Sequence, residues 1–123
     1  MAILTDDNYV DKAEQVIKSL NRNKRDSKLF LLTTSKIRNL LNLTSTHFDE
    51  SKVREYKDLA DKIAYLRVQF VYQSGRETSV KDLVKKAEIL DILKEINNQE
   101  SLQRFCRYME ALVAYFKFYG GKD

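Results

Sequence analysis

Few residues in this chain have the types and the spacing that enzymatic chemistry requires. The 123 residues include one histidine, His47, and one cysteine, Cys106, and they form no CxxC or HxxxH pattern that would bind zinc. The segment SGRE around Gly75 lacks the second glycine and the lysine of a phosphate-binding loop. We therefore predict no catalytic site, no metal site and no cofactor, with His47 structural or solvated and Cys106 in the core. A carboxylate pair assembled by the fold is the alternative that would make the chain an enzyme.

The basic residues are the other chemically informative group. The net charge is +4 and the sequence pI is about 9.1. Residues 18–32 carry five basic side chains against one acidic, and residues 33–76 carry eight against five, whereas residues 1–17 and 77–100 are net acidic. The positive excess therefore lies between Lys18 and Arg76. Such an asymmetry permits a surface that binds a polyanion such as a nucleic acid.

Six basic residues are the candidates for contact with phosphate groups: Lys36, Arg38, Lys52, Arg54, Arg67 and Arg76. Lys36 and Arg38 open a predicted helix but project about 200° apart, so at most one of them meets a given ligand directly. A phosphate there could instead use the free backbone N–H groups of the helix start, beside the hydroxyls of residues 33–35. Arg67 and Arg76 lie among apolar residues, where arginine holds either a carboxylate inside the fold or a phosphate outside it.

Apolar residues at helical spacing predict that an all-α fold carries these side chains. The chain has no proline and only three glycines, so little interrupts its helices. We predict a single-domain helical bundle of about five helices that covers residues 1–123. The predicted helices are Asp7–Leu20, one that follows the caps at residues 33–35 and continues through Phe48, Val53–Ser74, Thr78–Ile96 and Leu102–Gly121. Residues 21–28 form either a solvated connection or a basic arm, and residues 29–32 either an extended segment or a helix entry.

The last predicted helix has two apolar rows, which is typical of a helix with neighbours on more than one side. One row runs from Leu102 to Phe116, and the other comprises Tyr108, Ala111, Tyr115 and Phe118. The stretch YLRVQFVYQ at residues 65–73 also has apolar side chains on opposite faces. We predict that both stretches are enclosed and pack against each other, with Arg67 emerging through a gap. The last helix would then be the central post of the bundle.

Sequence features of targeting are absent. No apolar run reaches the length that spans a membrane, and the start MAILTDDNYV lacks the basic and apolar regions of a signal peptide. A single cysteine cannot form an internal disulfide, which favours a reducing compartment. We therefore expect a cytoplasmic protein that does not contact a membrane.

Three stretches closely resemble the small subunit of type III-A CRISPR effector complexes, the Csm complex. They are LTTSKIRNLL (Leu32–Leu41), YLRVQFVYQSGRE (Tyr65–Glu77) and FCRYMEALVAYFKFYGGKD (Phe105–Asp123). The start MAILTDDNYVDKAE is similar to streptococcal members, so the resemblance covers nearly the whole chain. Residues 21–28 and 44–56 stay unmatched. Lys52 and Arg54 are therefore candidates on charge alone, whereas the other four basic residues lie in matched motifs.

The resemblance implies a helical subunit of an antiviral ribonucleoprotein with no catalytic activity of its own. Copies of such a subunit stack beside the repeating backbone subunits that hold the guide RNA, and the row ends at a large polymerase-like subunit. Target RNA pairs with the guide RNA in the channel between the rows, where the small subunits contact it. Because guide sequences vary, these contacts are expected to use phosphates and 2′-hydroxyls instead of base edges.

Two other interpretations of the same residues remain open. A helical adaptor without direct RNA contact would use its basic residues only to pair with acidic partners. A helix-turn-helix DNA binder is weaker, because VKDLVKKAEIL lacks an obvious set of base-reading residues. Stacking of copies requires two complementary patches in a head-to-tail arrangement that does not close. Exposure of Phe118 and Tyr119 would favour the end of the last helix as one of those patches.

Overall fold

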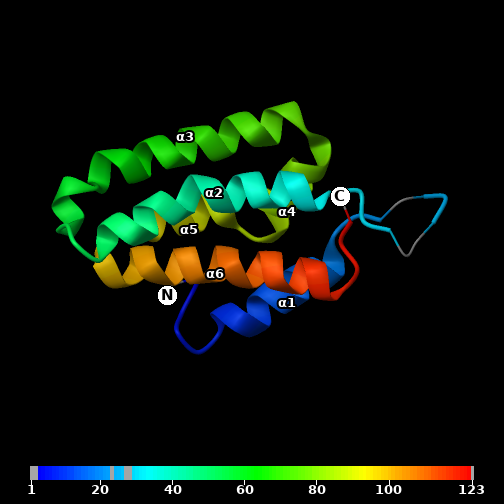
Figure 1. Ribbon diagram of the computed structural model, residues 1–123, viewed down its shortest axis with the longest axis horizontal. Helices are drawn as coiled ribbons and strands as arrows, with labels where there is room; N and C mark the ends of the chain where they lie inside the picture. The colour runs from blue at the N-terminus through cyan, green and yellow to red at the C-terminus, as the bar shows by residue number, and fades with distance from the viewer. Residues whose placement is uncertain (1–2, 23, 27–28, 123) are drawn as a thin grey trace.

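The computed structural model describes residues 3–22, 24–26 and 29–122, and within them the chain forms six α-helices and one 3₁₀ turn (Figure 1). The only strand-like pairing among these residues is an isolated antiparallel bridge between Arg22 and Phe30. The all-α prediction is therefore confirmed. The elements are α1 (Tyr9–Ser19), α2 (Thr34–Ser51), the 3₁₀ turn η1 (Tyr56–Asp58), α3 (Ala60–Arg76), α4 (Thr78–Lys86), α5 (Ile89–Glu95) and α6 (Gln99–Phe118).

Helix α6 occupies the middle of the structure. It packs mainly against α1 and α2, and it also touches α5. Its buried side chains are Leu102, Phe105, Cys106, Tyr108, Met109, Leu112 and Phe116. They belong to one hydrophobic core to which all six α-helices contribute. This arrangement agrees with the predicted central post, since burial of apolar surface is the main term that stabilises such a bundle.

The ends of α6 follow from local chemistry. Asn98 and Ser101 form a capping box, in which the Asn98 Oδ1 atom accepts a hydrogen bond from the Ser101 N–H at 2.8 Å. The sequence also offers Asn97 followed by Glu100 as a cap for this helix, but the observed cap lies one position later. At the other end Gly120 has φ +99°, a left-handed conformation that glycine adopts without strain. The Gly121 N–H then donates to the Phe116 carbonyl at 2.8 Å, which folds the chain back onto the helix end.

The prediction that residues 65–73 are enclosed on both sides is wrong. Their packing against the last helix is confirmed only at Phe70, whose ring centroid lies 6.2 Å from that of Phe105 in α6, whereas the rest of α3 runs along the top of Figure 1. Helix α3 buries Ile63, Leu66 and Phe70 on the one side where α2, α4 and α5 meet it, and nothing in the described structure covers its other side. The Tyr108 hydroxyl donates to the Ala87 carbonyl at 3.0 Å, between α4 and α5.

Two predicted helices are also interrupted. Residues 53–59 form turns and η1, so α3 begins at Ala60 instead of Val53. The predicted helix Thr78–Ile96 divides into α4 and α5 at Glu88, which has φ 57° and ψ 34°. A left-handed residue cannot continue a right-handed helix. The break redirects α5 so that it contacts α3 and buries Ile89, Ile92 and Leu93.

Candidate nucleic-acid interface

The six predicted basic residues fall in three separate places. Lys36, Arg38 and Arg76 lie where the start of α2 adjoins the end of α3, Lys52 and Arg54 follow α2, and Arg67 lies on α3 toward α5. All are exposed except Lys36, which is half-buried. The structure therefore does not gather them into one basic patch. Their value as phosphate contacts depends on which of them still has an unneutralised charge.

Lys36 and Arg76 differ in this respect, although they line the same hollow between α2 and α3. The Lys36 Nζ atom pairs with Glu77 Oε2 at 3.0 Å. Arg76 has no ion pair within the described residues, and its guanidinium lies 5.6 Å from the centre of the Tyr72 ring. Exposed arginine over an aromatic face remains available to an anion on its outer side. Arg38 is also exposed and forms no ion pair there.

The start of α2 is already occupied in part. Thr33 is the N-cap, and its hydroxyl accepts a hydrogen bond from the Lys36 N–H at 3.4 Å. The Thr34 N–H donates to the Lys122 carbonyl at 2.9 Å. Chain near the C-terminus thus takes one of the N–H groups that a phosphate would need. This geometry disfavours the predicted phosphate site at the helix start.

Lys52 and Arg54 lie in the turn after α2, beside Glu50. The Lys52 Nζ atom is 4.5 Å from the centre of the Phe48 ring. Glu50 accepts from Arg54 at 3.3 Å and from Lys62 at 2.7 Å. The hydrogen bond from Lys62 is the main cause that holds the pKa of Glu50 below its usual value. One carboxylate therefore serves two cations, whereas Lys52 forms no ion pair within the described residues.

Arg67 has a neighbour that sequence reasoning missed. It borders a hollow of about 170 Å³ together with Lys94 of α5. Both side chains belong to exposed residues, and neither forms an ion pair within the described part of the chain. The pairing depends on the break at Glu88, which no residue pattern indicated. A lysine in the last turn of a short apolar segment was the only available signal.

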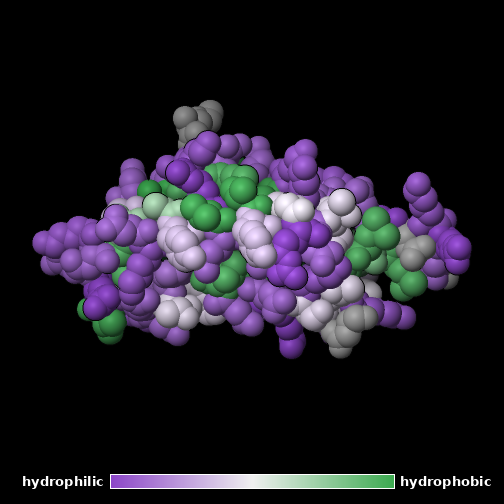
Figure 2. Space-filling view, turned by 90° about the horizontal axis from the view of Figure 1, so that it is seen from above, coloured by the Kyte–Doolittle hydropathy of each residue, from purple (hydrophilic) through white to green (hydrophobic). Residues whose placement is uncertain are grey.

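The outward face of α3 is apolar and uncovered. We name Tyr65, Val68, Val71 and Tyr72 the α3 stripe; they are 63%, 57%, 52% and 61% exposed. Figure 2 looks onto this side and shows hydrophobic surface among hydrophilic residues. Three stripe members, together with Leu43, Gln69 and Gln73, line a hollow of about 340 Å³ between α2 and α3. Uncovered apolar surface of this kind typically marks an interaction site.

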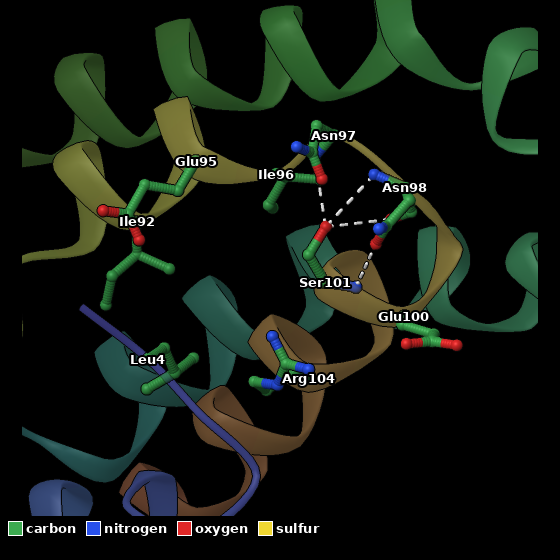
Figure 3. A pocket seen from close by; sticks show the side chains of 9 residues that line it. All are labelled: Leu4, Ile92, Glu95, Ile96, Asn97, Asn98, Glu100, Ser101 and Arg104. Atoms are coloured by element: carbon green, nitrogen blue, oxygen red, sulfur yellow. Dashed lines mark hydrogen bonds between the residues drawn. The ribbon is translucent and has the colours of Figure 1, made fainter. Parts of the chain in front are cut away.

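Another hollow, of about 200 Å³, lies at the start of α6, and several of the polar groups that line it already have partners (Figure 3). The Glu95 carboxylate accepts from the Ile3 N–H at 2.9 Å, and Arg104 pairs with Asp6 at 2.8 Å. That pair, chiefly through its hydrogen bond, lowers the pKa of Asp6. These contacts therefore fasten the first described residues to α5 and α6.

The residues that could act as a nucleophile or metal ligand are structural in their placement. Burial raises the pKa of Cys106 to about 12, and its Sγ atom lies 3.7 Å from the Thr44 carbonyl. His47 is half-buried, and the Nδ1 atom has no hydrogen-bond partner among the described residues. No three His, Cys, Asp or Glu side chains of those residues converge on a metal position. Within the same ranges no helix is long and apolar enough to cross a bilayer.

Comparison with known proteins identifies the family. The family model described as Csm2 Type III-A matches residues 5–122. A protein of Streptococcus thermophilus named CRISPR system Cms protein Csm2 is 63% identical over 123 residues, covering 100% of both chains. Proteins of the same name from Mycobacterium tuberculosis and Enterococcus italicus are 46% and 38% identical, over 100% and 80% of this chain and 99% and 76% of their own. The resemblance inferred from the three motifs is therefore confirmed, and the chain belongs to the Csm2 family of type III-A CRISPR systems.

Proposed function

We propose that this chain is a non-catalytic subunit that contacts target RNA in a cytoplasmic type III-A CRISPR effector complex. Several copies stack beside the backbone subunits that hold the guide RNA, and the row ends at the large polymerase-like subunit. The observation that carries the RNA contact is the exposure of Arg38, Arg67 and Arg76 without an acidic partner in the described residues. An arginine left unneutralised on a surface attracts phosphate.

The expected contacts do not read sequence. Basic side chains neutralise phosphates, and the logarithm of the affinity then falls linearly with the logarithm of salt concentration, with a slope of about 0.7 per phosphate of a single strand. Lys52 adds to the contact at the corner after α2, whereas Lys36 and Arg54 contribute less because each already pairs with a glutamate. The scattered cations suit a long ligand such as an RNA strand, which touches several places at once.

Two uncovered apolar patches support the stacking of copies. One is the α3 stripe, and the other is Phe118 at the end of α6, which is 76% exposed beside the half-buried Tyr119. The helices that bear them lie on opposite sides of α2. A patch on one side that binds a different patch on the other side produces a head-to-tail row. Exposure of Phe118 and Tyr119 was expected to favour the end of α6 as an interface. Phe118 is exposed, whereas Tyr119 is only half-exposed.

The test uses the complex purified from its own cells. Ultraviolet crosslinking of bound target RNA is expected to label this subunit, and Arg38→Glu, Arg67→Glu and Arg76→Glu are expected to assemble normally but hold target RNA less tightly. Lys85→Glu is the matched control, since Lys85 is exposed, has no ion pair in the described residues and is not among the six candidates. Unchanged RNA affinity of all three arginine variants at several salt concentrations would contradict the proposed RNA contact.

A second candidate function is a protein adaptor without RNA contact, and the α3 stripe favours it because apolar surface binds protein better than it binds phosphate. Val68→Asp and the arginine variants together separate the two functions, because Val68→Asp disturbs assembly under either and only the arginine variants test RNA contact. If the chain is only an adaptor, this substitution abolishes co-purification with the other subunits, while the arginine variants change nothing. Crosslinks from RNA to this subunit would exclude the adaptor.

A further inference from the structure

Two cations from different helices border one hollow between α3 and α5. Arg67 comes from α3, and Lys94 comes from the last turn of α5. The hollow has a volume of about 170 Å³. Small-molecule pockets usually begin at about 300 Å³, so this hollow is too small for a nucleotide or a cofactor. A single anionic group at its mouth matches its size and its charge.

The rest of the lining is apolar and contains no acid. Ala60, Ile63, Ala64, Leu93 and Ile96 contribute hydrocarbon, and Tyr56 contributes its ring. The Tyr56 hydroxyl is already engaged, because it donates to the Ile96 carbonyl at 3.0 Å. The two cations therefore stand over a floor that neither neutralises nor hydrogen-bonds them. The attraction between these cations and an anion is weakened less by solvent here than it would be between groups surrounded by water.

The fold holds this arrangement in place. The Tyr56 hydrogen bond ties η1 to the end of α5, and the left-handed Glu88 sets the direction of α5. Ile63 and Leu93, which line the floor, are buried core residues. Lys94 is also favoured at the C-terminal end of its helix by the helix dipole. Only the two cationic side chains have to adjust when an anion arrives.

We infer that Arg67 and Lys94 together bind one phosphodiester group of RNA, a site that rests on the proposed function and makes it specific. A carboxylate of a protein partner is the competing ligand. Beyond charge, however, the hollow offers no free donor or acceptor that could recognise a peptide backbone. A phosphodiester needs nothing more, because its charge is its main recognisable feature.

The test measures fluorescence anisotropy of a labelled 40-nucleotide RNA of mixed sequence with the full chain, between 50 and 200 mM salt. The variants are Arg67→Gln, Lys94→Gln and the double variant. Lys85→Gln is the matched control, since Lys85 is exposed, unpaired in the described residues and outside any hollow near Arg67. Circular dichroism confirms that each variant is folded.

Each single variant is expected to weaken RNA binding several-fold, and Lys85→Gln to have little effect. In the double variant the salt slope should fall by about 0.7, which corresponds to one phosphate of a single strand, and the combined loss should be smaller than the product of the single losses. A slope that falls by about 1.4 would mean two independent contacts and would overturn the shared site.

The remaining outcomes separate this site from the broader function. If Arg67→Gln weakens binding while Lys94→Gln matches the control, the shared site is wrong and RNA contact stands. If poly-glutamate binding is lost in the variants while RNA binding is unchanged, the ligand is a protein carboxylate. If the unmodified chain fails to bind RNA even at 50 mM salt, both the site and the proposed RNA contact are contradicted.

Discussion

Helices α3 and α6 are alike in sequence and differ in what covers them. Both carry apolar side chains on more than one side, although α6 also has a charged face that includes Arg107, Glu110 and Lys117. In α6 these side chains meet α1 and α2, and Tyr108 is fully buried. In α3 the core side meets its neighbours while Tyr65, Val68, Val71 and Tyr72 face outward.

This difference shows what an apolar second face means. Helical spacing reveals that a face is apolar, but it does not reveal whether the partner comes from the same chain. The second face of α6 packs against other helices of the same chain, so truncating its side chains should lower the free energy of unfolding. The outward face of α3 could be covered only by another molecule, so truncating its side chains should weaken binding to that molecule. The two helices can therefore be distinguished by paired substitutions.

The largest expected difference is between Tyr108→Ala and Tyr72→Ala. Loss of the buried ring, with its hydrogen bond to Ala87, should lower the free energy of unfolding by about 3–5 kcal/mol. Loss of the exposed ring should change it by about 0.5 kcal/mol or less. Urea unfolding followed by circular dichroism measures both. Equal losses would mean that the α3 stripe is enclosed after all.

Alanine at Gly121 and alanine at Gly75 should change the free energy of unfolding in opposite directions. A Cβ at Gly121 would lie 2.2 Å from the Phe116 Cε2 atom, so Gly121→Ala is expected to destabilise the protein by about 1–3 kcal/mol. At Gly75, inside α3, nothing lies within 4 Å of a new Cβ. Gly75→Ala should therefore stabilise by about 0.5–1 kcal/mol, because alanine is the better helix former. Thermal melting of the two variants tests this; a stabilising Gly121→Ala would contradict the closed end of α6.

Thiol reactivity provides a third comparison. Because burial raises the pKa of Cys106 to about 12, a thiol-reactive disulfide reagent at pH 8 should modify it only as fast as the protein opens. The comparison is the double variant Cys106→Ala, Val68→Cys, whose single cysteine lies on the α3 stripe. This exposed thiol should react at the rate of a free thiol. Rapid labelling of Cys106 in the folded protein would show that α6 is not enclosed there.

The raised pKa of Cys106 also makes the stability of the protein depend on pH. The unfolded thiol loses its proton from about pH 9, while the folded thiol keeps it to about pH 12. The contribution of Cys106 to stability is therefore present below pH 9 and is lost as the pH rises through this window. Unfolding midpoints of the unmodified chain and of Cys106→Ala should converge toward high pH. Parallel midpoints would contradict the shift.

The smallest expected effect concerns His47, on the side of α2 that adjoins α3. Burial is the main cause that lowers the pKa of His47, and Glu50 partly opposes it. Since the unfolded chain takes up the proton first, stability should decline as the pH falls below about 6.5. His47→Gln should flatten this part of the stability profile. A profile that is unchanged by the substitution would mean that His47 is solvated.

Sequence patterns predicted the helices well where side-chain spacing and caps act locally. The row from Leu102 to Phe116 and the terminal glycines defined α6, and Thr33 was among the expected caps of α2. The left-handed Glu88 could not be predicted, because glutamate rarely adopts that conformation and only the packing of α5 on α3 requires it. Exposure of the α3 stripe was missed for a related reason, since burial depends on which helices become neighbours.

The candidate site was predictable in its residue types more than in its pairings. Arg38, Arg67 and Arg76 lie in the matched motifs, but the sequence leaves open whether Arg67 and Arg76 pair inside the fold or face outward. Their electrostatic surroundings could not be predicted, because Lys36 meets Glu77 across two helices and Arg67 shares a hollow with Lys94 from a third. Such pairings link residues far apart in the chain, and periodicity contains no information about them.

The position of α6 in the chain has a consequence for synthesis. Helices α1 and α2 leave the ribosome early, yet the surface on which both rest is made last among the described helices. The hydrogen bond from the Tyr119 hydroxyl to Glu14 joins residues 105 positions apart. Closing such a distance has to precede most of the stabilising contacts. The nascent chain must therefore hold its first apolar stripes uncovered until translation is nearly complete, and a message interrupted before α6 would yield a fragment that proteases remove.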